Sequence, residues 1–282
     1  MGKGAITRAW LSGLLLLAGC DGSTDDESAT VETRPAAITF DGANYKTDPA
    51  KLAHGERLTY VLGCRGCHGK QLEGQKWDDD PKEYGVMWAS NVTRAVPTMS
   101  DAQLAALLTT GVHPKRADLW VMPSELFQHL SKADLDALIA FLRTVPPAGE
   151  LSPDPVPGPV ALRQIESGEI KNAAAMVRDL KSVGPVDLGK DRGLGRYITR
   201  VTCAECHGPE LMGRAGDTPD LITAGAYSRA DFEKLVTQGV PTGNRKLHEL
   251  MQSVAKSRFS HLTSHERDAL YAYLKARAEQ PQ

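Results

Sequence analysis

Two short segments of identical pattern constrain this chain more than any other feature. Cys64-Arg-Gly-Cys-His68 and Cys203-Ala-Glu-Cys-His207 both read Cys-x-x-Cys-His, and each begins a longer stretch that matches the other at an offset of 139 residues. Residues 100–112 likewise match residues 228–240 at an offset of 128, and residues 130–142 match residues 262–274 at an offset of 132. The offsets change because insertions lie in the loops between matching pieces. The chain is therefore a duplicated unit.

The matching pieces predict helices. Ser or Thr N-caps are followed three residues later by an acidic residue in the last helix of each copy, which is typical of a capping box. Glycines at the ends of the preceding helices fit the C′ position. The residues concerned are Ser131 with Asp134, Thr263 with Glu266, and the helices from Ser100 to Gly111 and from Ser228 to Gly239. Helical spacing also precedes each Cys pair, over residues 52–62 and 194–201, and no strand alternation stands out. We expect an all-α protein.

Cys-x-x-Cys-His is the attachment signature of c-type haem. One helical turn presents two thiols to the two vinyl groups of a haem and places the adjacent imidazole beneath the iron. The sequence therefore predicts two covalently bound c-type haems, attached through Cys64 and Cys67 and through Cys203 and Cys206, with His68 and His207 as axial ligands. The alternatives are a thioredoxin-type redox pair, which needs a βαβ context, and a four-Cys zinc site, whose pairs would lie closer in sequence.

The second axial position of each iron is predicted from the repeat. Met122 and Met251 stand at equivalent places after the matched Ser100 and Ser228 helices, within one residue. Met99 and Met212 have no methionine counterpart in the other copy. His129 and His261 recur just before the last helix and are the rival ligands, although packing at the helix start suits them better. The other histidines outside the motifs do not recur and are expected at the surface: His54, His113, His248 and His265.

The amino terminus has the pattern of an export signal. Lys3 and Arg8 precede an apolar run over residues 9–19, which is too short to span a bilayer as a helix. Its end, Leu17-Ala-Gly-Cys20, resembles the lipobox of bacterial lipoproteins. That resemblance implies cleavage before Cys20 and a lipid anchor on its sulfur. A plain secretory signal with an incidental cysteine is the alternative.

The length and charge of the chain are consistent with two globular domains on a tether. The 282 residues suffice for two domains, and 33 Lys and Arg against 35 Asp and Glu leave no basic excess to predict nucleic-acid binding. Loss of residues 1–19 changes the net charge from −2 to −4, which favours docking with a basic partner face. The predicted organisation is a signal peptide (1–19), a flexible acidic tether (20–47), a first domain (48–147), a Pro-rich linker with a connecting helix (148–185) and a second domain (186–282).

The haem motifs together with the two final helical segments, residues 130–143 and 262–275, resemble the class I cytochrome c family. The chain is similar to tandem dihaem c-type cytochromes and to multihaem cytochrome subunits of membrane-associated bacterial dehydrogenases. The resemblance implies two all-α cytochrome c domains, in each of which the first and last helices cross. It also implies His/Met ligation, carried onto His68 with Met122 and His207 with Met251. Met251 departs from the pattern because no Pro follows it, whereas Met122 precedes Pro123.

These observations predict an electron carrier rather than an enzyme. We expect single electrons to pass between a dehydrogenase or quinol-oxidising complex and a terminal acceptor, on the periplasmic side of a bacterial cell envelope, with the protein held at the membrane by its lipid. The alternative is a dihaem cytochrome c peroxidase, which also carries two such motifs. The Phe-x-x-Pro-x-Leu-Arg-Asn-type segment associated with that family has no counterpart here.

Overall fold

The computed structural model describes residues 37–116, 119–243 and 245–280. The predicted signal peptide, Cys20 and the acidic part of the tether lie outside the described residues. In the described part of the chain, no helix combines the length and apolar character needed to span a membrane.

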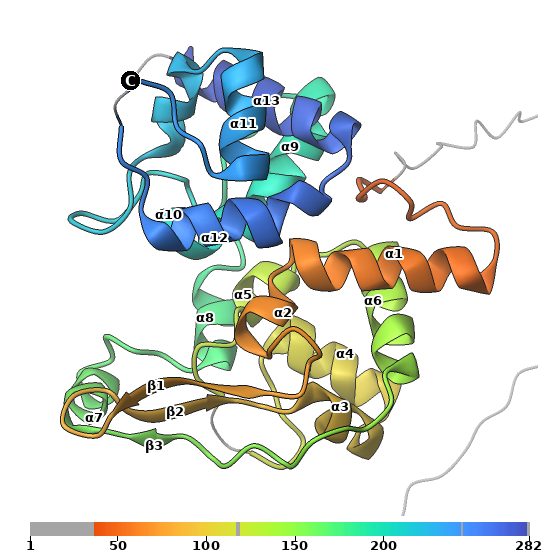
Figure 1. The fold of residues 1–282 in the computed structure, drawn as a ribbon, viewed down its shortest axis with the longest axis vertical. Helices are drawn as coiled ribbons and strands as arrows, with labels where there is room; N and C mark the ends of the chain where they lie inside the picture. Colours follow the sequence, from red (N-terminus) through yellow and green to blue (C-terminus); the bar gives the residue numbers. More distant parts are fainter. Residues whose placement is uncertain (1–36, 117–118, 244, 281–282) are drawn as a thin grey trace, which may run out of the picture. The chain divides into compact units, whose positions relative to one another are not determined.

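The first half is built of helices with a small sheet along one side (Figure 1). Its elements are α1 (Asp48–Val61), α2 (Cys64–Cys67), β1 (Gln75–Asp80), β2 (Gly85–Ala89), α3 (Val92–Ala95), η1 (Val96–Thr98), α4 (Asp101–Thr110), α5 (Ser124–Phe127) and α6 (Lys132–Thr144). The predicted helix ends hold here: Ser100 caps α4 in a full capping box, and Gly111 ends it with φ of +68°.

A connecting segment and the second half follow. The connection contains β3 (Val156–Pro157), α7 (Pro159–Glu166) and α8 (Ala173–Asp179). The second half contains η2 (Lys190–Arg192), α9 (Gly193–Ile198), the π-helix η3 (Thr199–Cys203), α10 (Ala204–His207), η4 (Leu221–Ala226), α11 (Arg229–Gln238), α12 (Glu249–Ser257), η5 (Phe259–His261) and α13 (Ser264–Ala278). Gly239 ends α11 with φ of +68°, as Gly111 ends α4.

In each half the first helix crosses the last helix at a glycine. A Cβ on Gly55 of α1 would lie 2.0 Å from the Ala137 carbonyl oxygen of α6. A Cβ on Gly195 of α9 would lie 2.2 Å from the Ala269 carbonyl oxygen of α13. The backbones approach so closely because neither crossing residue has a side chain. The fold is thus the predicted all-α tandem arrangement with the two crossings expected of it.

The small sheet is the main departure from the sequence prediction. β1 pairs with β2 and β2 with β3, all antiparallel. The β1–β2 hairpin lies between Gly74 and Ser90, whereas the corresponding loop of the second half runs from Gly213 to Pro219 and is ten residues shorter. The hairpin therefore fills the insertion that the changing repeat offset placed in this loop. Neither strand has the polar–apolar alternation that would predict it, because β1 is short and mainly polar and β2 is short and entirely apolar.

The segment over residues 148–185 is docked on the first half. Asn91 donates to the carbonyl oxygens of Ala148 and Glu150 at 2.8 Å, and β3 extends the hairpin sheet. Further on, α8 packs against α4 and α5. The predicted helical stretch after Val160 is present, and it is interrupted at Gly168, where φ is +77°. The Pro-rich segment therefore does not stand free between the halves.

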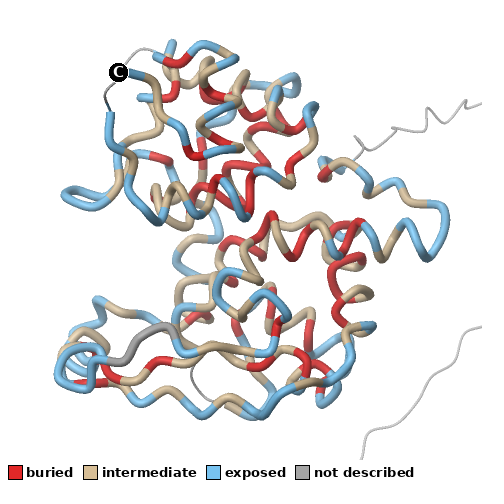
Figure 2. Tube along the Cα trace, in the orientation of Figure 1, coloured by how far each residue is buried: buried red, intermediate tan, exposed pale blue. Residues whose placement is uncertain are grey.

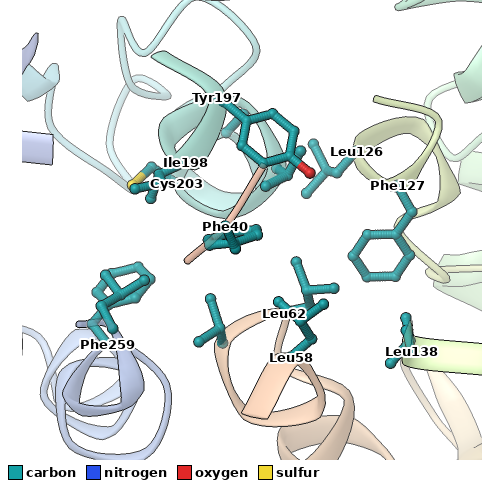
Figure 3. Close-up of a cluster of buried hydrophobic side chains, with 14 of the residues drawn as sticks. Phe40, Leu58, Leu62, Leu126, Phe127, Leu138, Tyr197, Ile198, Cys203 and Phe259 are labelled. Atoms are coloured by element: carbon teal, nitrogen blue, oxygen red, sulfur yellow. The ribbon is translucent and has the colours of Figure 1, made fainter. Parts of the chain in front are cut away.

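One hydrophobic core runs through both halves (Figure 2). Figure 3 shows Phe40 among residues from both, including Leu62 and Leu126 from the first half and Ile198 and Phe259 from the second. Phe40 is 1% exposed although it lies in the stretch predicted as a tether, so this part of the chain is packed. The two halves share an interior, and burial of this apolar surface favours a fixed arrangement between them.

Polar bonds at the starts of the two last helices reinforce this interface. The Asp134 carboxylate accepts from the Phe40 N–H and from the hydroxyl of Tyr197 in the second half. The Glu266 carboxylate accepts from the Asp41 N–H and binds Arg57 of the first half at 2.8 Å. Thr263 and Glu266 form the predicted capping box. The capping box predicted at Ser131 is only half present: the Ser131 hydroxyl oxygen accepts from the Asp134 N–H, but the Ser131 N–H donates to the Tyr197 hydroxyl and not to the Asp134 carboxylate.

Candidate haem-binding sites

The loops that follow the two motifs have the same backbone geometry. The N–H of Gly74 donates to the His68 carbonyl oxygen at 2.8 Å, and the N–H of Gly213 donates to the His207 carbonyl oxygen at 2.8 Å. Leu72 and Leu211 occupy the same place in these loops, are fully buried, and have φ of +63° and +64°. A leucine in the left-handed region is strained and persists only where its surroundings fix it. Both copies hold this strain next to the motif histidine.

Each motif histidine is oriented by a backbone carbonyl. His68 Nδ1 lies 2.8 Å from the Ser90 carbonyl oxygen, and His207 Nδ1 lies 2.8 Å from the Pro219 carbonyl oxygen. A carbonyl only accepts, so Nδ1 of each ring carries the proton and donates it. Nε2 is then the unprotonated nitrogen, which is the form that binds a metal. Burial also lowers the pKa of both imidazoles and favours the neutral ring.

The motif cysteines do not have the character of a redox pair. Burial raises the pKa of Cys64 and of Cys203 to about 11, so both remain neutral thiols at neutral pH. A thioredoxin-type pair requires a lowered pKa at the attacking thiol. The zinc alternative also lacks support, because the described residues contain no cluster of three or more His, Cys, Asp or Glu side chains that could hold a metal ion.

The second motif opens onto a cavity of about 590 Å³. Cys203, Cys206 and His207 lie on its wall, and Met251 of α12 lines the same cavity. The remaining lining is mainly apolar, with Leu221, Tyr227, Phe232, Leu235, Val236, Val254, Phe259, Leu270 and Leu274. A cavity of this volume with apolar walls and a few directed polar groups is typical of a cofactor site. The thiols, the imidazole and the thioether around it suit a covalently attached haem.

The first half holds Met122 in a fixed turn. Met122 is half-buried against the hydrophobic core, between Val121, whose φ is +64°, and Pro123. The next residue, Ser124, is fully buried and donates from its hydroxyl to the Leu107 carbonyl oxygen of α4 at 2.9 Å. This bond attaches the Met122 turn to α4. Met212, which the repeat excluded as a ligand, is 66% exposed.

The other histidines fall in places that the sequence predicted only in part. His129 and His261 stand before the last helices, and His261 stacks on Tyr60 with ring centroids 4.1 Å apart. His265 is exposed as expected. The expectation for His54 was wrong: it is buried, and its Nε2 lies 2.7 Å from the Asp134 carboxylate. The burial of His54 could have been predicted from its position in α1, on the helix face that packs against α6.

His248 lies at the surface as expected, but it also lines the second cavity. It is the N-cap of α12, and its Nδ1 accepts from the Leu250 N–H at 3.2 Å. A neutral histidine that accepts at Nδ1 carries its proton on Nε2. In this geometry His248 has no free nitrogen for a metal, whereas the Met251 thioether needs no deprotonation.

The fold, the two equivalent motif loops and the apolar cavity define a haem protein of the c-type cytochrome class. Residues 52–146 match the family model of cytochrome c, and residues 191–274 match that of subunit III of the cbb3-type cytochrome c oxidase. A comparison of the whole chain with curated proteins gave no match. The chain therefore contains two cytochrome c domains in tandem and is an electron-transfer haem protein.

Proposed function

We propose that this chain is a dihaem electron carrier, with one haem bound covalently to each half. One observation carries the proposal: both motif histidines have Nδ1 fixed on a backbone carbonyl at 2.8 Å, so both present Nε2 in the same way. The axial pairs are His68 with Met122 and His207 with Met251. A haem with two protein ligands has no open position and suits electron transfer, in which the iron alternates between Fe(II) and Fe(III).

The partners we propose are a dehydrogenase or quinol-oxidising complex as donor and a terminal acceptor downstream. The match of the second half to a subunit of a terminal oxidase supports a place in respiratory electron transfer. The exposed charged residues that line the second cavity are three basic ones, Arg214, Arg245 and Lys246, and one acidic one, Asp217. Although the chain as a whole is slightly acidic, this basic excess favours a partner with an acidic face at the second haem.

We further propose that the protein is exported and anchored through a lipid on Cys20, facing the periplasm. The apolar run over residues 9–19 and the sequence Leu17-Ala-Gly-Cys20 support this location. Cys20→Ser in the full chain, expressed in a bacterial host, should move the haem protein from the membrane fraction to the soluble fraction. A wild-type chain that is soluble, or whose mature form does not begin at Cys20 by mass spectrometry, would contradict the anchor.

The test of the carrier function is spectroscopic. The purified protein should contain two haems per chain, and its ferric form should show the near-infrared band of Met-to-Fe(III) ligation. Met122→Ala and Met251→Ala should each remove about half of this band, whereas the exposed Met212→Ala should leave it unchanged. His248→Ala should leave it unchanged as well.

The same samples separate the carrier from the peroxidase. A carrier should be low-spin in both oxidation states and should not turn over hydrogen peroxide above the level of free haem. A high-spin ferric haem with peroxide turnover would overturn the proposal in favour of a dihaem peroxidase.

A further inference from the structure

Arg258 is a buried cation that contacts the haem-attachment segments of both halves. It follows α12 in the second half and is 9% exposed. Its Nε donates to the Val61 carbonyl oxygen at 3.2 Å, three residues before Cys64, and its Nη1 binds the Glu205 carboxylate at 2.7 Å, within the second motif. A single guanidinium therefore connects the two motifs.

The first half is shaped to receive this side chain. Helix α1 ends at Val61, so the Val61 carbonyl is one of the terminal acceptors that the helix itself leaves unpaired. Gly63 follows with φ of +81°, and a Cβ there would lie 2.7 Å from Cζ of Arg258. The break in the helix thus provides an acceptor, and the glycine provides the space.

The equivalent place in the other half is apolar. Arg258 corresponds to Leu126 at the repeat offset of 132, and Leu126 is buried where α5 packs on η3. The helix that Leu126 meets, the first helix of the second half, has no break, because it continues through the π-helix η3 into the motif. At this pair of equivalent positions one half therefore has a buried cation and the other half has an apolar side chain. An exact repeat would have the same residue at both.

Arg258 keeps one nitrogen without a partner at the second site. Nη2 is buried and has no hydrogen-bond partner among the described residues, and Arg258 lines the second cavity together with Cys203 and His207. Its charge lies beside both motifs, since the guanidinium contacts the Val61 carbonyl just before the first motif and the Glu205 carboxylate within the second. A fixed cation near an iron disfavours Fe(III), which carries one more positive charge than Fe(II).

We propose that Arg258 is a positioning residue for electron exchange between the two halves: it fixes the two attachment motifs against each other and raises the reduction potentials of both haems. This inference rests on the proposed dihaem carrier. With a haem in each half, the exchange would move one electron from the ferrous iron of one half to the ferric iron of the other. No bond forms or breaks, and no proton is required.

The test compares Arg258→Gln, Arg258→Lys and Glu205→Gln in the haem-loaded full chain. Midpoint potentials of both haems are measured by spectroelectrochemical titration. Arg258→Gln should shift the Fe(III)/Fe(II) equilibrium of each haem about tenfold toward Fe(III), which is a potential lower by about 59 mV for a one-electron couple. Arg258→Lys keeps the charge and should keep most of the potential. Glu205→Gln removes the opposing carboxylate and should raise both potentials.

Leu126→Met is the matched control at the equivalent position and should leave both potentials in place. Unchanged potentials in Arg258→Gln, or a shift at one haem only, would overturn the inference. If Arg258→Gln does not load two haems, Glu205→Gln decides, because a failure to raise both potentials also overturns it. Haem content and the near-infrared band of the wild type test the carrier function separately, so a failure there is distinguishable from a failure of Arg258.

Discussion

The two halves are alike around their motif histidines and unlike where their first helices end. After each histidine the same hydrogen bonds and the same strained leucine recur. Before each motif the halves diverge: Gly63 breaks the helix of the first half, whereas the second half continues through η3 and is one residue shorter from Gly195 to Cys203 than from Gly55 to Cys64. The loop after each motif histidine therefore has one geometry in both halves, whereas the segment before each motif, which forms the interface between the halves, differs.

A second asymmetry lies in the two side chains that cross the interface. Arg57 and Tyr197 occupy equivalent places two residues after the crossing glycines. Each binds the carboxylate at the start of the other half's last helix, but Arg57 makes an ion pair with Glu266 and Tyr197 a neutral hydrogen bond with Asp134. The comparison predicts unequal costs when the two contacts are removed.

The largest effect is expected from Glu266→Ala. The Glu266 side chain is fully buried and accepts from the N–H groups of Asp41 and Thr263 as well as from Arg57. Its loss leaves the Arg57 guanidinium without its buried partner, which costs about 3–5 kcal/mol of unfolding free energy. Urea unfolding of the haem-loaded chain measures this. Asp101→Ala breaks the exposed pair with Arg143 and should cost under about 1 kcal/mol, so equal effects would refute the assigned role of Glu266.

Gly63→Ala should rank second. The new methyl group must adopt a positive φ and displace Arg258, which together cost about 2–3 kcal/mol. Gly168→Ala is the matched control, because Gly168 also has positive φ but nothing within 4 Å of its Cβ position, and we expect about 1 kcal/mol there. Thermal unfolding of both variants gives the difference. Equal costs would show that the contact with Arg258 contributes nothing.

Much of this fold and of the sites was accessible from the sequence. The capped helices follow from local chemistry, and the residues of both haem motifs were chosen from spacing alone; the ligand roles of Met122 and Met251 remain predictions. The hairpin could not be predicted from alternation, because β1 is short and mainly polar and β2 is short and entirely apolar, although the changing repeat offset marked its position. The sequence predicts Asp134 only as part of its own helix cap, because no local pattern indicates that Tyr197 of the other half will donate a hydrogen bond to its carboxylate. Arg258 was detectable only as a cation aligned with Leu126, and its contacts are set by tertiary packing.

Tyr197→Phe should cost less than Glu266→Ala. The phenol hydroxyl donates to the Asp134 carboxylate at 2.8 Å and accepts from the Ser131 N–H at 3.0 Å. Asp134 keeps its bonds from Phe40 and His54, so the loss should be about 1–2 kcal/mol. Chemical denaturation at neutral pH measures it. A cost as large as that of Glu266→Ala would show that the neutral contact, and not the ion pair, holds the halves together.

The smallest expected effect distinguishes the equivalent histidines His129 and His261 by their response to acid. Burial, with a smaller contribution from the Arg200 charge, lowers the pKa of His129 to about 4, and burial with the charges of Arg57 and Arg65 lowers the pKa of His261 to a lesser extent. Between about pH 4 and 6.5 the unfolded chain therefore binds a proton at His129 that the folded chain does not, and stability falls as the pH falls through this range.

His129→Gln removes this linkage, so the variant should lose less unfolding free energy than the wild type between pH 7 and pH 5. His261→Gln should flatten the profile less, because the folded pKa of His261 lies closer to its ordinary value. Carboxylates titrate in all three proteins and cancel in the comparison. Denaturant unfolding at both pH values provides the measurement, and parallel profiles for the wild type and His129→Gln would mean that folding does not lower the pKa of His129. The near-infrared band should stay unchanged in both variants, since the thioethers of Met122 and Met251, and not these imidazoles, are the proposed ligands.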